Sequence, residues 1–356
     1  MINKKNKDLI FKAAILTKLK KKLLISNIKF NHNLTRGQIL VKMYYSGICG
    51  SQIGEINGVK GKDNFLPHLL GHEGTGIIID TNKNVKRFKK GDKVILHWQK
   101  GEGYDANSPT YYMGKKKINA GRVTTFNEYA VVSENRLTKI PKGVSKKQAV
   151  IFGCALTTGF GAVVYDANIE KNKSILIFGA GGIGMSIIQI LTLMKPKKIV
   201  IVDSNVNKKK ILKKFKQKNF VLFRNKNFNK IKEEILNFNE GNCFDYVFDT
   251  TGSGNIIELS LDLMMKKSKL ILLGVQNFKE KISFNTLQIV LGKKMIGSTG
   301  GNINPTKDIP LIHKIIKKNN INLSNFYNKT FKLTEINQAI KYMSQQKSYE
   351  RILIKF

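Results

Sequence analysis

The sequence predicts an α/β protein of two domains, in which a β-rich domain precedes a domain built on a doubly wound parallel sheet. The chain has 356 residues, of which 42% are hydrophobic, and this length exceeds the size at which one core stops growing. Near Ser174 the apolar pattern changes from short runs to strands that alternate with longer helical stretches. A glycine-rich turn follows the first strand of that second region.

The first region, residues 11–150, consists of short apolar runs that are broken by Gly, Asn and Lys. Examples are residues 39–45, 76–80 and 93–97. Short runs with this turn punctuation are typical of β-structure. We therefore expect a β-rich first domain.

The second region alternates strands and helices, which is typical of repeated βαβ units and a parallel sheet. We expect helices at 185–194 and 208–215 and strands at 175–178, 199–202, 244–249, 270–273 and 293–296. A helix at 333–343 and a strand at 351–356 follow, and this strand is expected to rejoin the first domain. The predicted domains are residues 1–160, completed by 303–356, and residues 161–302.

The charge and the cysteines limit the possible partners and the compartment. The net charge is +38, but only six of the 62 basic residues are arginine, and no basic motif interleaved with aromatic residues occurs. This pattern indicates composition bias, so we expect no specific nucleic-acid partner. No apolar run reaches the ~18 residues of a membrane span, and Met1 to Asp8 lack the apolar stretch of a signal peptide. With three cysteines, which argue against a disulfide framework, we expect a soluble, cytoplasmic protein without membrane partners.

The glycine-rich turn has the spacing of a dinucleotide site. Gly179, Gly181 and Gly184 form a GxGxxG that lies directly after an apolar strand and before a helix, and Gly182 lies inside it. A side chain at Gly179 or Gly181 would hold a pyrophosphate away from the free amides of the helix N-terminus. These four glycines are therefore candidate cofactor ligands in a Rossmann domain.

Asp203 supports this interpretation because it ends the next strand, near the ~20 residues past the glycines at which a ribose-binding acid is expected. A carboxylate there repels a 2′-phosphate, so NAD is favoured over NADP. Lys208, Lys209 and Lys210 weaken that preference, and Lys208 is itself a candidate cofactor ligand. Alternatively, Asp203 only caps the helix that follows Ser204.

Three glycine-containing phrases each carry a residue type that binds zinc. They are Ser46-Gly-Ile-Cys49-Gly-Ser51, Leu70-Gly71-His72-Glu73-Gly74 and Phe152-Gly-Cys154-Ala-Leu-Thr157. Two thiolates and one imidazole leave the fourth tetrahedral position open, as in a catalytic zinc site. Taken singly, each cysteine is more simply a small buried hydrophobe and His72 a satisfied core histidine, but three matching motifs favour a metal site. Cys243 matches no ligand motif and is expected to pack in the sheet.

These motifs occur together with four further phrases: Phe88-Lys-Lys-Gly91-Asp92, Phe126-Asn-Glu-Tyr-Ala130, Phe248-Asp-Thr-Thr-Gly252 and Ile336-Asn-Gln-Ala339. In this order they resemble the zinc-dependent alcohol dehydrogenases of the medium-chain dehydrogenase/reductase superfamily, over almost the whole chain. The resemblance implies a GroES-like catalytic domain and a Rossmann NAD-binding domain. It also implies hydride transfer between NAD and a small alcohol, or its aldehyde or ketone.

The resemblance assigns roles to individual residues. Cys49, His72 and Cys154 would bind one catalytic zinc, with Glu73 behind the metal and the Ser51 hydroxyl relaying a proton to or from the substrate oxygen. The residues that would approach the nicotinamide are Thr158, Val275 and Arg351. The resemblance also implies a homodimer through the strand at 293–296, in preference to a homotetramer.

The chain departs from the family at several positions. Residues 93–131 contain no cysteine, so we expect no structural zinc, and a loop that is ordered by packing alone. Gln52 stands where the family usually has Asp, and Gly54 where some members have the last histidine of the proton relay. Asn82 replaces a glycine at a bend, and because Asn tolerates a positive φ better than most residues, we expect the turn to survive the change.

Three points stay open. His97 and Trp98 either line the substrate pocket or form a packed Trp with a surface His. A metal-free reductase of enones or quinones from the same superfamily is an alternative, against which the three candidate zinc ligands argue. The other alternative is a non-catalytic protein that senses NAD or associates with nucleic acid, and it needs neither an open metal position nor Ser51.

Overall fold

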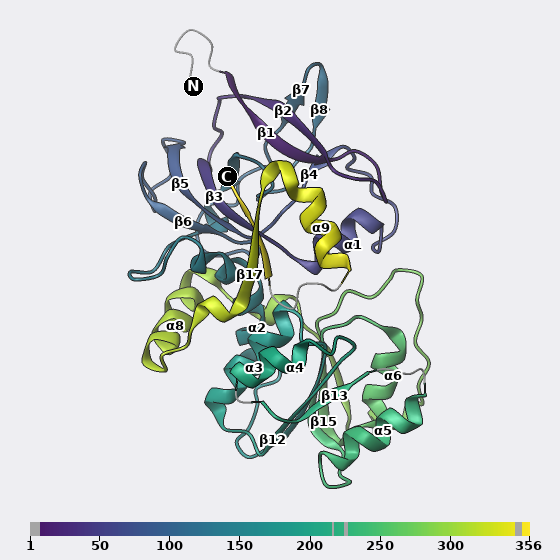
Figure 1. Cartoon of the computed structure of the whole chain (residues 1–356). Coiled ribbons are helices and arrows are strands. Elements are labelled where there is room, and N and C mark those ends of the chain that lie inside the picture. Colours follow the sequence, from purple (N-terminus) through teal and green to yellow (C-terminus); the bar gives the residue numbers. More distant parts are fainter. Residues whose placement is uncertain (1–7, 216, 224–226, 346–350) are drawn as a thin grey trace. The chain divides into compact units, whose positions relative to one another are not determined.

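A computed structural model of the chain describes residues 8–215, 217–223, 227–345 and 351–356 (Figure 1). The first seven residues, which are most of the segment considered for a signal peptide, lie outside this description. Two compact units are present: the first comprises the chain up to Gly58, Lys62–Thr157 and Asn304–Phe356, and the second comprises Val59–Gly61 and Thr158–Ile303. The short piece Val59–Gly61 belongs to the second unit because the carbonyl of Val59 accepts a hydrogen bond from Phe278 N (2.9 Å).

The first unit contains two sheets. One has the order β4-β1-β2-β7-β8, and the other has the order β10-β6-β5-β3-β18-β17 with β9 also paired to β3. The strands are β1 (Asp8–Leu16), β2 (Leu24–Asn31), β3 (Gln38–Ile48), β4 (His68–Leu69), β5 (Gly74–Thr81), β6 (Lys93–Leu96), β7 (Tyr111–Met113), β8 (Lys116–Ile118), β9 (Tyr129–Ser133), β10 (Leu137–Lys139), β17 (Tyr327–Lys332) and β18 (Arg351–Lys355). The helices are α1 (Gly50–Asn57), α8 (Pro305–Lys318) and α9 (Ile336–Ser344), and α2 (Ala155–Gly161) begins in this unit.

Strand β1 shows why this region folds as sheets. Phe11, Ala13 and Ile15 are buried at alternate positions, as a strand with period two requires, and they join one apolar cluster with Tyr111 of β7. Toward the end of β1, Ala14 and Leu16 are buried as well and join a second cluster that includes residues of α9 and β18. The C-terminal strand therefore contributes to the core of the first unit.

Strand β18 pairs antiparallel with β3, with Ile352 opposite Ile48 and Leu353 opposite Gly47. It also pairs in parallel with β17. This register brings Arg351, the first residue of β18, to the end of β3 from which Cys49 follows. The chain end thus contributes directly to the candidate metal centre.

The second unit is built on one parallel sheet of six strands in the order β13-β12-β11-β14-β15-β16. The strands are β11 (Ser174–Phe178), β12 (Lys198–Asp203), β13 (Phe220–Leu222), β14 (Phe244–Asp249), β15 (Met264–Leu272) and β16 (Lys294–Gly297). The helices are α3 (Gly182–Met194), α4 (Lys208–Lys214), α5 (Phe228–Asn237), α6 (Gly254–Asp262) and the short α7 (Leu287–Val290). This is the strand order of the Rossmann fold, and it confirms the predicted α/β class.

Helices cover both faces of this sheet, with α3 on one side and α5 and α6 on the other (Figure 1). Strand β11 is buried at all five positions, as expected for a strand covered on both faces. Ile231 and Ile235 of α5 and Ile257 of α6 pack with Leu176 in one apolar cluster. The reversal of strand order between β11 and β14 places a crevice at the carboxyl ends of these strands, where ligands bind in open α/β sheets.

The turn at Asn82 forms as expected, but without a left-handed residue. Asn82 is not among the described residues with positive φ. Its side chain closes the turn instead, because Nδ2 donates to Leu34 O (2.7 Å) and Oδ1 accepts from Asn84 N (3.1 Å), so no left-handed backbone is needed.

The loop at 98–107 is not ordered by packing alone. The Asp105 carboxylate pairs with Arg122 (3.1 Å) and Lys100 (3.7 Å), and the Ser133 hydroxyl accepts from Ala106 N (2.8 Å). Charged and polar contacts therefore add to packing in holding this segment.

Within the described part of the chain, no helix is both long and apolar enough to cross a bilayer.

Candidate metal centre and cofactor edge

Cys49 is positioned by the junction of β3 and α1. It is the residue before the helix, with an extended backbone, and it is buried. The Gln52 side chain, in the first turn of α1, accepts a hydrogen bond from Cys49 N (2.8 Å). The helix ends at Gly58 in the left-handed conformation that favours glycine. Both ends of α1 are thus defined by the local sequence.

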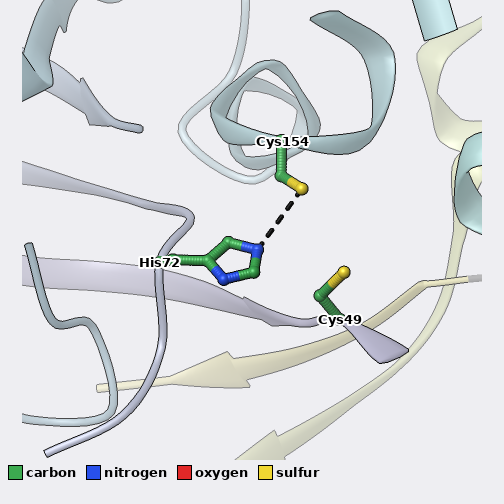
Figure 2. Close-up of side chains that lie close together, drawn as sticks. All are labelled: Cys49, His72 and Cys154. Atoms are coloured by element: carbon green, nitrogen blue, oxygen red, sulfur yellow. Dashed lines mark hydrogen bonds between the residues drawn. The ribbon is translucent and has the colours of Figure 1, made fainter. Parts of the chain in front are cut away.

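His72 follows β4 through a glycine that no other residue could replace without rearrangement. Gly71 has φ +89°, and a Cβ placed there would lie 2.3 Å from Thr125 Oγ1. The tight turn directs the partly buried imidazole of His72 toward Cys49 and Cys154 (Figure 2).

Cys154 lies between a 3₁₀ helix, Gln148–Gly153, and α2. Its carbonyl accepts a hydrogen bond from Thr157 Oγ1 (2.9 Å), which caps the irregular turn, and its thiol is buried. Three segments that are far apart in the sequence therefore meet at one point.

The three candidate ligand atoms fit a zinc ion. The Cys49 and Cys154 sulfurs and an imidazole nitrogen of His72 all lie within 4.8 Å of one another, and His72 Nε2 is 3.3 Å from Cys154 Sγ (Figure 2). Usual zinc bond lengths at a tetrahedral angle place such atoms about 3.6–3.8 Å apart, so small side-chain shifts suffice. Within the described residues this is the only group of three or more His, Cys, Asp or Glu side chains with metal-binding geometry.

Glu73 and Arg351 form a buried ion pair beside the cluster. Arg351 Nε is 3.0 Å from Glu73 Oε1, Arg351 Nη2 is 3.4 Å from Oε2, and Arg351 Nη1 donates to Ile48 O (3.3 Å). Gly47 and Gly153 make room for the carboxylate, because a Cβ at Gly47 would lie 2.2 Å from Glu73 Oε1. The pair places a neutralised carboxylate next to the three ligands.

Burial and mutual contacts shift the pKa values in this cluster. Burial raises the pKa of Glu73 to about 7 against the opposing effect of the Arg351 charge. The hydrogen bond with Cys154 lowers the pKa of Cys49, and the same contact raises the pKa of Cys154. Burial lowers the pKa of His72, but the hydrogen bond and charge of Cys49 outweigh it and raise the value overall. The cluster therefore favours a thiolate at Cys49, which is the ligand form of cysteine.

Ser51, the expected proton-relay residue, lies in the first turn of α1, two residues after Cys49. Its Oγ is shielded from solvent and has no hydrogen-bond partner within the described residues. Buried hydroxyls are normally paired, and an unpaired one at a candidate active site is available to a ligand.

Sequence reasoning missed two features of this site. It expected Arg351 at the nicotinamide, whereas the structure places its guanidinium against Glu73. It recorded Gln52 only as a departure from the family, whereas the Gln52 amide contacts both Cys49 and His72. The Arg351 contact has no local signal, since Arg351 lies 278 residues from Glu73 and only the pairing of β18 with β3 brings them together.

His97 and Trp98 have separate positions. His97 is buried, contacts Gln99 O (2.8 Å) and Thr138 Oγ1 (3.1 Å), and burial lowers its pKa to about 4. It is therefore neither a surface residue nor a pocket residue, and both expectations for it are wrong. The centroid of the Trp98 ring lies 6.3 Å from the centroid of the His72 ring, which places Trp98 beside the candidate metal centre.

The glycine turn of the second unit forms a cradle between β11 and α3. Gly179 has φ +90°, and a Cβ there would lie 2.4 Å from Thr250 Oγ1. A Cβ at Gly184 would lie 2.0 Å from Gly179 O, so close packing of helix against strand requires this glycine. Around Gly181, in contrast, no atom lies within 4 Å of an added Cβ, so it faces open space at the helix N-terminus. Gly182 is the first residue of α3.

Asp203 lies beside this turn at the end of β12. Its Oδ2 accepts from Ala180 N (2.7 Å) in the glycine turn, and its Oδ1 accepts from Asn205 N (2.8 Å). The carboxylate thus links the two loops that flank the crevice and does more than cap the next helix. Lys208 is buried at the start of α4, in the same region.

Val275 and Thr158 complete the predicted set. Val275 follows β15 at the carboxyl edge of the sheet, is about half exposed and packs on Gly252. Thr158 lies in α2, and its Oγ1 is buried without a hydrogen-bond partner in the described part of the chain. The second unit therefore brings the glycines, Asp203 and Val275 to one edge, which suits a dinucleotide.

Two family models match the chain. Residues 35–142 match the alcohol dehydrogenase GroES-like domain, and residues 182–318 match the zinc-binding dehydrogenase model. A curated relative, S-(hydroxymethyl)glutathione dehydrogenase from Escherichia coli, is 26% identical over 345 residues, which cover 89% of this chain and 92% of the relative.

Solved structures are similar over nearly the whole chain. Benzyl alcohol dehydrogenase from Acinetobacter calcoaceticus has a TM-score of 0.84 at 20% identity, and the match covers 98% of this chain and 99% of the other. Acetophenone reductase from Geotrichum candidum, solved in complex with NAD, has a TM-score of 0.78 at 18% identity, with 98% and 97% covered. At these identities the likeness establishes the fold.

Proposed function

The chain belongs to the zinc-dependent alcohol dehydrogenases of the medium-chain superfamily, and from this premise we propose that it transfers a hydride between an alcohol, or its aldehyde or ketone, and NAD. The observation that carries the proposal is the convergence of Cys49, His72 and Cys154 from three distant segments. The names of the similar proteins differ in substrate but share a hydroxyl or carbonyl carbon, so we propose this group as the reacting one.

Cys49, His72 and Cys154 would hold one zinc ion and leave one coordination position for the substrate oxygen. When bound, the metal supplies a Lewis acid that polarises that oxygen. The Ser51 hydroxyl would relay the proton: its oxygen accepts the proton of the alcohol as its own O–H proton passes on to water, and both transfers are reversed in the other direction. The ion pair of Glu73 and Arg351 keeps a fixed carboxylate close to the ligands without adding net charge.

The cofactor residues proposed in the second unit are Gly179, Gly181, Gly182, Gly184 and Asp203. The open space at Gly181 and the amides of the α3 N-terminus suit a pyrophosphate. The Asp203 carboxylate favours the ribose of NAD and repels a 2′-phosphate. Roles for Thr158, Lys208 and Val275 at the cofactor are part of the same proposal.

We further propose that the chain binds one metal and forms a homodimer. The described residues contain one cluster with metal-binding geometry, and residues 93–131 lack cysteine. Strand β16 is the last strand of its sheet and is paired on one side by β15. Exposed apolar side chains of the adjacent segment, Leu287, Val290 and Leu291, suit a partner copy at this edge.

Metal analysis combined with a panel of primary and secondary alcohols tests the proposed activity. We expect about one zinc per chain and alcohol-dependent formation of NADH. Cys154→Ala should lose the zinc and the turnover but keep NAD binding, because Cys154 supplies a metal ligand only. Cys243→Ala is the matched control and should keep all three properties.

Three outcomes would contradict the proposal. A zinc content near two per chain would remove the single-metal assignment. Turnover of enones or quinones by the zinc-free chain would favour the metal-free reductase. NAD binding by a zinc-loaded chain that oxidises no alcohol would favour the non-catalytic alternative.

A further inference from the structure

The Gln52 amide lies between the backbone of one candidate ligand and the ring of another. Gln52 is almost fully buried in the first turn of α1. Its Oε1 accepts a hydrogen bond from Cys49 N (2.8 Å), and its Nε2 contacts His72 Nδ1. A backbone N–H only donates, so the amide oxygen must face Cys49 and the NH₂ group must face His72.

This orientation decides which nitrogen of His72 carries the proton. The NH₂ group of Gln52 only donates, so Nδ1 of His72 must accept. A neutral imidazole has a single N–H, which is then on Nε2. Nε2 lies 3.3 Å from Cys154 Sγ, to which it donates. Every donor from Cys49 N through Gln52 and His72 to Cys154 therefore finds an acceptor.

The same network opposes the binding of a metal. Nε2 faces the Cys154 sulfur, so this is the nitrogen that would coordinate zinc, and it needs a free lone pair to do so. The proton must then be on Nδ1, and position 52 must offer an oxygen to it. The oxygen of the Gln52 amide faces Cys49 N–H, and in this orientation the NH₂ group, not the oxygen, lies against His72 Nδ1. A carboxylate at this position has two acceptor oxygens and would serve both donors.

We propose that Gln52 is a positioning residue that holds metal-free His72 in the tautomer with the proton on Nε2. Zinc binding then requires the Gln52 amide to rotate by about half a turn, so that its oxygen faces His72. Turning the amide leaves Cys49 N–H facing an NH₂ group in a buried position, which costs free energy. Zinc therefore binds more weakly than it would with Asp at position 52. The inference rests on the proposed zinc site and concerns its affinity, which can be measured without any activity.

The zinc affinities of the wild type and of Gln52→Asp, measured by competition with a chelator, provide the first test. We expect Gln52→Asp to bind zinc about 10–100-fold more tightly, the range found when partners of metal-binding histidines are changed. Gly50→Asp controls for the added charge, because Gly50 is exposed next to Cys49 and a Cβ there meets no atom within 4 Å. At ~0.15 M salt this exposed carboxylate should change the affinity by a few-fold at most.

The tautomer itself is the second readout. The measurement is the ¹⁵N NMR spectrum of histidine-labelled, zinc-free protein at a pH where imidazole is neutral. The chain has five histidines, and the His72 signal is identified as the one that His72→Ala removes. We expect a proton on Nε2 in the zinc-free wild type, and on Nδ1 in zinc-free Gln52→Asp and in the zinc-loaded wild type.

The outcomes separate this inference from the proposed function. A zinc-free wild type with the His72 proton on Nδ1, or equal zinc affinities of the wild type and Gln52→Asp, would overturn the role of Gln52 and leave the zinc site standing. Failure of both proteins to bind zinc would overturn the zinc site, and the role of Gln52 with it.

Discussion

The Ser51 hydroxyl at the start of α1 makes no hydrogen bond to the described part of the protein. It is shielded from water and lies two residues from Cys49. A buried hydroxyl without a hydrogen bond costs about 1–3 kcal/mol, so its presence is best explained by a partner that arrives with the substrate. This supports the proposed role of Ser51 in proton transfer.

We expect Ser51→Ala to lower kcat by roughly 10²–10⁴-fold, which is the usual contribution of a positioned acid or base. The dissociation constant for NAD should stay within about two-fold, because the hydroxyl acts on the substrate oxygen only. Ser51→Thr keeps the hydroxyl and should retain most of the turnover. Steady-state kinetics and NAD titration measure both effects, and an unchanged kcat in Ser51→Ala would remove Ser51 from the mechanism.

The individual residues show what sequence patterns could predict of the site. Cys49, His72 and Cys154 were predictable because each has glycines beside it, and Gly71 and Gly153 do make room for close contacts in the structure. The partner of Glu73 was not predictable, since it depends on the register of β18 against β3. The role of Gln52 depends on the direction of one amide, which no sequence pattern contains.

Among the elements, the segment at residues 98–107 is held by charged groups. Asp105 pairs with Arg122 (3.1 Å), Lys100 (3.7 Å) and Arg136 (4.0 Å), and Arg136 also donates to Trp98 O (2.7 Å). Arginine is rare in this lysine-rich chain, and its planar group can hold a carboxylate and a carbonyl at once. These contacts keep Trp98 beside His72.

Asp105→Asn should lower the free energy of unfolding of the first unit by about 1–2 kcal/mol at pH 7, since three cations lose one carboxylate and one of them, Arg136, is partly buried. Asp8→Asn is the control: it removes a single ion pair, with Lys29, and should cost less than about 1 kcal/mol. Urea unfolding measures both. Equal effects of the two variants would mean that the Asp105 network adds nothing beyond a surface pair.

The contribution of Asp105 should also depend on pH. Burial raises its pKa, but the hydrogen bond from Asn135 and the charges of Arg122 and Lys100 outweigh this and lower it. The pKa of Asp105 is lower in the folded than in the unfolded chain, where it is about 4. The stabilisation is therefore complete at a pH above the unfolded-state pKa and is lost as the pH falls through the folded-state pKa. The difference between wild type and Asp105→Asn should therefore shrink below about pH 4.

The elements also differ in how well their patterns predicted them. The buried strand β11 lies where its apolar run predicts it, because both of its faces are covered, and β14 lies at the predicted residues 244–249 although Asp245 interrupts its apolar run. The predicted helix at 333–343 is divided, with a 3₁₀ turn at Leu333–Glu335 before α9, where the Glu335 side chain accepts from Lys332 N (2.8 Å). Such an N-terminal boundary depends on local capping, which periodicity does not show.

At the scale of the whole molecule, the sheet of the second unit has two edge strands in the described part of the chain, β13 and β16, each paired on one side only. Strand β16 ends the sheet after β15, and the preceding segment exposes Val290 (79%), Leu287 (54%) and Leu291 (50%). Isolated exposed apolar residues are ordinary, but a cluster beside an open strand edge favours association or aggregation. A two-fold axis through β16 would join two six-stranded sheets and cover the cluster.

The double variant Val290→Lys/Leu291→Lys should therefore convert the dimer into a monomer, because each two-fold contact would bring like charges together in a surface that excludes water. Sedimentation velocity at micromolar concentration measures the change, and circular dichroism verifies that the chain stays folded. Leu311→Lys is the matched control, since Leu311 is an exposed apolar residue of α8 in the other unit and should leave the dimer intact. A double variant that still sediments as a dimer would exclude β16 as the interface, and a monomeric wild type would exclude the dimer itself.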